Sequence, residues 1–87
     1  MISVYLNIMS FDNIDWKDVI KKEARGLKDD DLGEVQEVRA NDIITKVGIV
    51  DKETYCIPKR HVTRFDGHNL WFNITKDEAK TQYKIID

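Results

Sequence analysis

The sequence predicts a mainly β fold, a small barrel or strongly curved sheet of about five strands with a short helix before it and another after it. Two strand signals are the β-branched run 43–45, which follows turn residues 41–42, and the alternating apolar residues of 70–74. The 87 residues leave room for one domain, and 41% hydrophobic with 34% charged side chains suit a packed core beneath a solvated surface. Such a core is small, so a homodimer interface would widen the stability margin.

The first residues differ in composition from the rest of the chain. Apolar side chains alternate there with mostly uncharged partners, which is the period of a β-strand. The alternating apolar residues are Ile2, Val4, Leu6 and Ile8. We therefore expect residues 1–13 to form an edge strand, or an arm that pairs with a second chain, and residues 14–87 to form the barrel domain.

A short helix is expected at about 15–21, because Trp16, Val19 and Ile20 have the i, i+3, i+4 spacing of one apolar helix face. Three residues at its start offer N-cap oxygens: Asp12, Asn13 and Asp15. Gly33 then closes a polar turn, and we expect it to supply a backbone angle that other residues avoid.

The segment 34–40 is predicted to be a bulged strand that leads into a hairpin. The spacing of Leu32, Val35 and Val38 by three would suit a helix as well. The turn residues 41–42 and the β-branched run after them favour the strand.

Two further strands are expected on either side of a charged turn at 51–53. Val47 and Ile49 are candidate inward positions on the first strand, and Tyr55 and Ile57 are candidates on the second. In the final strand, 68–75, one phase is apolar. Its apolar residues are Leu70, Phe72 and Ile74, and the strand follows a tight turn at Asp66-Gly67.

A helix is predicted to begin at Thr75, because Thr75 and Glu78 form a capping box that places Ala79 and Tyr83 on one face. Trp71 lies among the polar residues on the other face of the preceding strand, so we expect something to pack against that face as well. Either Tyr83 of the terminal helix covers it, or a second protein does, since tryptophan is a frequent interface anchor.

The side chains do not form a recognisable catalytic set. Cys56 could act as a nucleophile with His61 or His68, but it has no glycine-rich turn or helix N-terminus beside it to lower its pKa. The spacing of the two histidines is not that of a zinc pair, and a second cysteine is absent. We expect no enzymatic activity, no metal and no cofactor.

Two charge clusters have ordinary explanations. The acidic run 29–31 lacks the alternating ligand pattern of a calcium loop, which favours a solvated turn. The basic residues of 17–28 are interspersed with Asp18 and Glu23, which favours a solvated helix face over a nucleic-acid site. The net charge of −2 also disfavours binding to a phosphate backbone.

A single cysteine predicts a cytoplasmic protein, because an extracellular domain of this size would ordinarily need several disulfides. No run approaches the roughly 20 apolar residues that span a bilayer, and the N-terminus lacks the features of a signal peptide. Any membrane association is therefore expected to be indirect, through a partner.

The order of several short motifs resembles that of the PRC-barrel domain family, over about residues 15–80. The matching segments are Trp16 to Ile20, Leu32-Gly33-Glu34-Val35-Gln36-Glu37-Val38, Tyr55-Cys56-Ile57-Pro58 and Val62. The chain departs from the family at Lys28 to Asp31, where members often carry a glycine-rich turn, and residues 1–12 have no counterpart.

The resemblance implies a non-catalytic, homodimeric barrel, most similar to stand-alone archaeal forms. Some archaeal members act in FtsZ-based cell division by binding the membrane-anchoring adaptor SepF, which implies a protein-binding adaptor. The alternative is a ribosome- or RNA-associated module similar to the barrel of RimM. The candidate partner contacts are Trp71, Tyr55, Tyr83, Val4 and Leu6.

Overall fold

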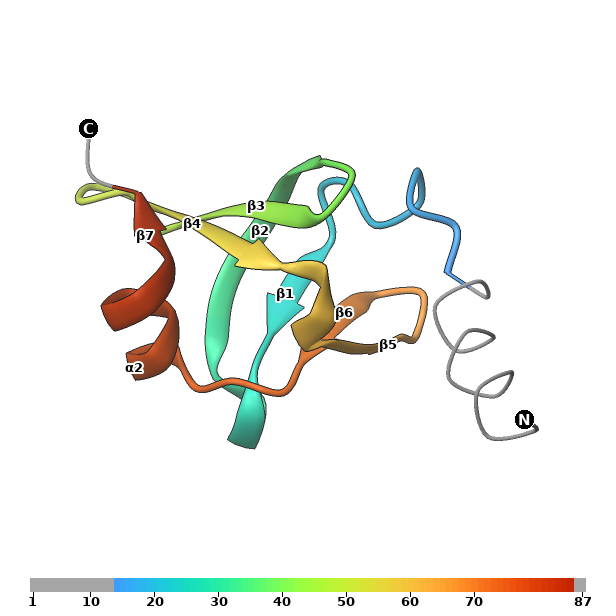
Figure 1. Cartoon of the computed structure of the whole chain (residues 1–87). Helices are drawn as coiled ribbons and strands as arrows, with labels where there is room; N and C mark the ends of the chain where they lie inside the picture. The colour runs from blue at the N-terminus through green and yellow to red at the C-terminus, as the bar shows by residue number, and fades with distance from the viewer. Residues whose placement is uncertain (1–13, 86–87) are drawn as a thin grey trace.

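The computed structural model describes residues 14–85, and the predicted arm at 1–13 lies outside this range. The mainly β prediction is confirmed: seven strands of the described residues form one curved sheet in the order β5-β6-β1-β2-β3-β4-β7 (Figure 1). The strands are β1 (Glu23–Arg25), β2 (Asp31–Val38), β3 (Asp42–Val47), β4 (Glu53–Pro58), β5 (Val62–Phe65), β6 (Asn69–Phe72) and β7 (Lys84–Ile85). The edge strands β5 and β7 do not pair with each other, so the described part of the barrel is open.

Four short helical segments connect or follow the strands. They are η1 (Leu27–Asp29), η2 (Lys59–His61), α2 (Lys76–Glu78) and η3 (Ala79–Tyr83). The last two form one continuous helical segment, which we call the C-terminal coil and which lies against β4 and β7 (Figure 1). None of the helices between residues 14 and 85 is both long enough and apolar enough to span a membrane.

Strand β1 joins the two parts of the sheet. It pairs antiparallel with β2, where Ala24 lies opposite Gly33, and parallel with β6, where Ala24 lies opposite Leu70. The hairpins β2–β3, β3–β4 and β5–β6 supply most of the remaining pairing. The predicted bulge in β2 is confirmed by a register shift between Val35 and Glu37.

The inner face of the curled sheet encloses a single core. Side chains from every strand except β7, together with Val19 and Ala79, contribute to it. The largest completely buried side chains are Tyr55, Leu32, Ile43, Ile57, Leu70, Val19, Val35 and Thr45. Burying these apolar groups is the main stabilising contribution of the fold.

The prediction of a helix at 15–21 is wrong, because residues 16–21 form turns. The Asp15 carboxylate accepts a hydrogen bond from the Lys17 N–H at 3.1 Å, as a cap would, but no helix follows. Lys21 has a φ of 69° and donates its N–H to the Val35 carbonyl at 2.7 Å. This long-range bond to β2 replaces the bond that would have continued a helix.

The predictions of about five strands and of an inward-facing Ile49 are also wrong. Short strands β1, β5 and β7 carry weak sequence signals, and the described chain has seven strands. Strand β3 ends at Val47 because Gly48 adopts a φ of 96°, which leaves Ile49 in the following loop.

The capping box at the C-terminal helix is confirmed. The Glu78 N–H donates to Thr75 Oγ1 at 3.1 Å, and the Thr75 N–H donates to Glu78 Oε1 at 3.0 Å. The special backbone angle expected at Gly33 is confirmed as well, with a φ of 97°. A Cβ at Gly33 would lie 2.4 Å from the Lys46 carbonyl oxygen, so only glycine allows β2 and β3 to approach this closely.

One buried polar group weakens this core. Thr45 is completely buried, and its hydroxyl has no hydrogen-bond partner among the described residues. Replacing Thr45 with valine is expected to raise the free energy of unfolding by about 1 kcal/mol, because an unpartnered buried hydroxyl costs roughly this much. Urea unfolding of the two proteins measures the difference.

The same substitution at Thr54, a half-buried residue of β4, is the matched control. It is expected to change the free energy of unfolding by less than about 0.5 kcal/mol. A clear loss of stability in Thr45→Val would contradict the assignment of the hydroxyl as unpartnered.

Candidate functional site

The most exposed large apolar side chains of the described residues lie together at the end of the β3–β4 hairpin. Ile49 is 91% exposed and Val50 is 90% exposed, whereas the next value is 45%, at Leu27. We call Ile49 and Val50 the apolar tip. Adjacent aliphatic side chains with this exposure contribute nothing to the core, which is typical of a surface that binds something else.

The backbone of the loop presents the apolar tip away from the sheet. The positive φ of Gly48 turns the chain out of β3, and a Cβ at this position would lie 2.7 Å from the Asp51 carbonyl oxygen. The loop therefore closes on itself through backbone proximity that requires glycine. Ile49 and Val50 are left at its outer end.

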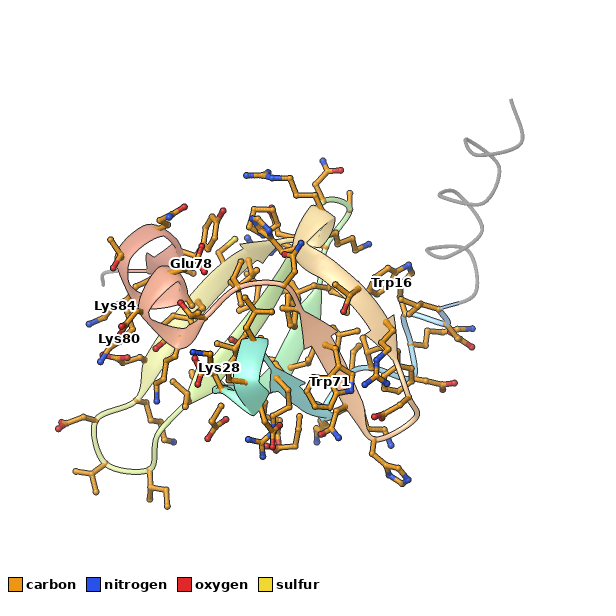
Figure 2. All side chains as sticks on the ribbon, turned by 90° about the horizontal axis from the view of Figure 1, so that it is seen from below. Trp16, Lys28, Trp71, Glu78, Lys80 and Lys84 are labelled. Atoms are coloured by element: carbon orange, nitrogen blue, oxygen red, sulfur yellow. The ribbon has the colours of Figure 1, made fainter. Side chains whose placement is uncertain are left out.

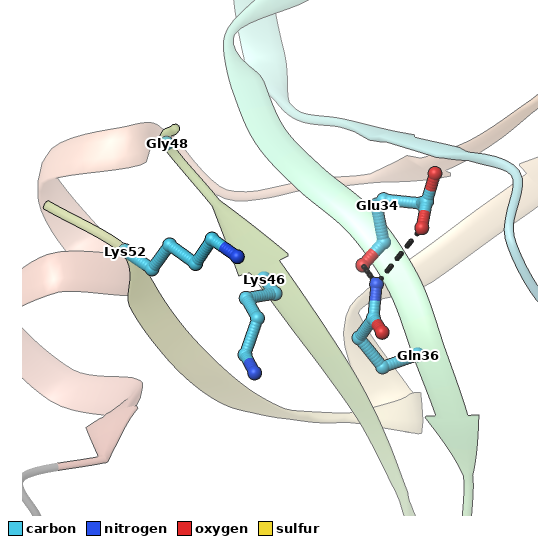
Figure 3. Close-up of a pocket in the computed structure, with 5 residues that line it drawn as sticks. All are labelled: Glu34, Gln36, Lys46, Gly48 and Lys52. Atoms are coloured by element: carbon cyan, nitrogen blue, oxygen red, sulfur yellow. Dashed lines mark hydrogen bonds between the residues drawn. The ribbon is translucent and has the colours of Figure 1, made fainter. Parts of the chain in front are cut away.

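A polar hollow of ≈ 390 Å³ lies beside the apolar tip (Figure 3). It is lined by Glu34, Gln36, Lys46, Gly48 and Lys52. The Gln36 amide donates to Glu34 Oε1 at 2.9 Å. Neither Lys46 nor Lys52 forms an ion pair with any residue that the structure describes, although Lys46 lies opposite Glu34 in the β2–β3 pairing.

More lysines lie at the same end of the molecule, on the C-terminal coil and β7 (Figure 2). Lys84 pairs with Glu53 at 3.1 Å, just after the hairpin loop. The pKa of Glu53 lies below its ordinary value because Tyr55 and then Lys84 donate hydrogen bonds to it, and the charge of Lys80 adds to the effect. Lysines and carboxylates thus both lie at this end of the molecule, and the Lys84 charge is compensated by Glu53.

Trp71, the foremost predicted partner contact, is half-buried on β6 and has partners within the chain. Its indole N–H donates to Asp66 Oδ2 at 2.9 Å, and the Arg64 guanidinium lies 4.9 Å from the ring centroid. Arg64 thus packs on the indole ring, whereas Tyr83, which was expected to cover Trp71, contacts His61 instead.

The predicted turn at Asp66-Gly67 is confirmed. Asp66 Oδ1 accepts hydrogen bonds from the N–H groups of His68 at 2.9 Å and Asn69 at 2.7 Å. The hydrogen bond from the Trp71 indole, followed by these two backbone bonds, holds the pKa of the Asp66 carboxyl well below its ordinary value.

Tyr83 joins the C-terminal coil to the sheet through His61. Its hydroxyl lies 2.7 Å from His61 Nε2, and the two rings are 5.4 Å apart. The other ring nitrogen of His61 lies 3.0 Å from Asn73 Oδ1, at the end of β6. With its proton on Nδ1, His61 donates to Asn73 and accepts from Tyr83, so this cluster is a structural clamp.

Tyr55, another predicted contact, does not add to the exposed surface. Tyr55 is completely buried, and its hydroxyl donates to Glu53 Oε1 at 2.7 Å. Burial, and then the bond to Glu53, raise the pKa of Tyr55 above its ordinary value. Val4 and Leu6 lie outside the described residues.

The groups considered for catalysis are not brought together. Cys56 lies on β4, His61 is held by Asn73 and Tyr83, and His68 lies at the exposed β5–β6 turn. Burial, and then the nearby charge of Asp42, raise the pKa of the Cys56 thiol, which disfavours the nucleophilic thiolate.

The acidic run 29–31 is partly engaged in backbone capping. Asp31 Oδ1 accepts from the Gly33 N–H at 2.9 Å, and Asp30 Oδ2 accepts from the Lys76 N–H at 2.8 Å. Over residues 14–85, no group of three or more His, Cys, Asp or Glu side chains is suited to hold a metal.

Sequence reasoning missed the apolar tip because it extended the strand through Ile49. One available signal was the order Gly48, two aliphatic residues and then Asp51, which places the aliphatic pair between turn formers.

No protein-family model, curated protein or solved structure matches this chain.

The hydrogen bonds of Asp66 generate a pH-dependent prediction. Asp66→Ala is expected to lower the melting temperature at about pH 7, because the carboxylate that accepts hydrogen bonds from His68, Asn69 and Trp71 is removed. The folded pKa lies below the ordinary value of 3.8, so this stabilisation is present above that value and is lost as the pH falls below it. Thermal unfolding from about pH 7 to about pH 2 should show the difference between the two proteins shrinking.

Asp18→Ala is the control for this experiment. Asp18 is exposed and its carboxylate accepts no hydrogen bond from any described residue. A difference between Asp66→Ala and the parent chain that stays constant down to the lowest pH would contradict the role of the charged Asp66 carboxylate.

Proposed function

We propose that this chain is a non-catalytic protein-binding adaptor that docks through the apolar tip. The observation that carries the proposal is the exposure of Ile49 and Val50, 91% and 90%, in a domain whose other large apolar side chains are mostly buried. Covering an aliphatic side chain of this size contributes about 2 kcal/mol to association. A partner that covers both gains enough to form the centre of a small interface.

The roles of the other chemically active side chains support docking over catalysis. His61, Tyr83 and Asp66 are used in hydrogen bonds that hold the fold, and the raised pKa of Cys56 keeps its thiol protonated. The polar hollow is open and lies beside the tip, where a partner would extend over it.

We further propose that the chain is a PRC-type domain that acts as a homodimer, as the motif order implies. The motif 32–38 coincides with β2, the motif 55–58 ends β4, and Val62 begins β5 after a short turn. The β5 edge, which pairs with no further strand of the described residues, offers backbone groups for pairing between copies. The resemblance suggests a place in an archaeal cell-division or membrane-associated assembly, with a SepF-like protein as the partner.

The RNA-binding alternative has less support. Arg25, in the middle of the basic segment, lies 3.6 Å from Glu23 and 3.7 Å from Asp29. Its charge is therefore compensated locally, which weakens the basic patch that RNA would require.

The proposal predicts that Ile49→Ser with Val50→Ser abolishes partner binding and leaves the fold intact. Both side chains are solvated in the free chain, so the free energy of unfolding should change by less than about 0.5 kcal/mol. Tagged full-length chain, expressed in its native cells, is purified with its partner, and the bound partner is quantified by mass spectrometry. The double variant should recover at least about tenfold less.

The matched control is Ile20→Ser with Leu27→Ser, which removes two partly exposed aliphatic residues, 41% and 45% exposed, outside the hairpin. It should recover the partner at the level of the parent chain. Equal recovery by the tip variant would contradict docking through the tip, and loss in both double variants would show that general surface hydrophobicity is responsible.

A further inference from the structure

The apolar tip and the polar hollow form one continuous surface. Gly48 lines the hollow and directly precedes Ile49, and Lys52 lines the hollow two residues after Val50. A ligand that covers the tip therefore also reaches the hollow. This continuity allows apolar and charged groups of one ligand to bind at the same time.

The lysines of the hollow are available to a ligand. Lys46 and Lys52 are exposed residues that line the hollow shown in Figure 3, and neither has an ion-pair partner among residues 14–85. In contrast, Lys84 is engaged by Glu53 at 3.1 Å. A hollow with two available ammonium groups and a single carboxylate, that of Glu34, has a local positive excess although the chain as a whole carries −2.

We infer that the partner of this surface presents a short acidic peptide segment in which a carboxylate neighbours aliphatic side chains. The carboxylate enters the hollow and binds the ammonium groups of Lys46 and Lys52, and the aliphatic groups cover Ile49 and Val50. The inference rests on the proposed docking function and specifies the chemistry of the ligand. Charge complementarity supplies the selectivity, and the apolar contact supplies the affinity.

An anionic bilayer fits this surface less well. Asp51 directly follows Val50 at the end of the loop, so its carboxylate would be brought to the level of the lipid headgroups if the tip inserted. A peptide avoids this conflict, because it can be placed on the lysine side of the loop, away from Asp51.

Selection from a displayed library of random dodecapeptides on the immobilised full chain tests this inference. The expected binders combine Asp or Glu with aliphatic residues. Fluorescence anisotropy of the most enriched peptide should show at least about a tenfold weaker affinity for Lys46→Gln with Lys52→Gln, and a further weakening as salt is added. The matched control, Lys17→Gln with Lys21→Gln, removes two exposed lysines of the N-terminal turn and should bind as the parent chain does.

The outcomes separate the two proposals. Peptides that require Ile49 and Val50 but are neutral, and are insensitive to Lys46→Gln with Lys52→Gln, would overturn the acidic ligand and leave docking through the tip standing. Binders that are indifferent to Ile49→Ser with Val50→Ser would overturn both. Sedimentation with vesicles of phosphatidylcholine and phosphatidylserine in equal parts, lost in the tip variant and without acidic peptide enrichment, would assign the tip to a bilayer and overturn both as well.

Discussion

The continuity of the sheet depends on the three residues of β1, Glu23–Arg25. This strand lies between β2 and β6, and it is the element that joins the β5–β6 hairpin to the strands β2, β3, β4 and β7. Ala24 is completely buried opposite both Gly33 and Leu70, so a small side chain is needed where the two parts meet. Two backbone hydrogen bonds extend this junction: the Lys21 N–H donates to the Val35 carbonyl, and the Val35 N–H donates to the Lys22 carbonyl. One shared core, rather than two hydrophobic clusters, is the consequence.

The polar side chains of the domain are mostly used to hold its periphery onto this sheet. Tyr83, His61 and Asn73 clamp the C-terminal coil, and Glu53 receives both the Tyr55 hydroxyl and the Lys84 ammonium group. Such satisfied networks stabilise a small fold and leave few groups available for chemistry. The surface of the β3–β4 hairpin differs, because Ile49 and Val50 lie outside the core and neither Lys46 nor Lys52 has an ion-pair partner among the described residues. This contrast is why we place function there.

Local features could be predicted from the sequence, and non-local ones could not. The capping box of Thr75 and Glu78 and the turn at Asp66 involve residues at most three positions apart, so their residue types determine them. The turn at 15–21 does not become a helix because Lys21 bonds to Val35, fourteen positions away, and no local pattern contains that contact. Strand β1 was missed for the same reason, since its three residues have no strand pattern and pair only with distant segments. The apolar tip could not be predicted because it requires knowing where β3 ends, and the positive φ of Gly48 determines that end.

The central claim is that Ile49 and Val50 are solvated in the free chain and thus available to a partner. Methyl NMR of the free full-length protein with a soluble gadolinium complex measures this directly, because relaxation enhancement rises with solvent access. The methyl groups of Ile49 and Val50 are expected to show the largest enhancement among isoleucine and valine residues of the described range, while the completely buried Ile43 and Ile57 show the smallest. Enhancement at Ile49 and Val50 as low as at Ile57 would show that the tip is already covered, and would contradict the account.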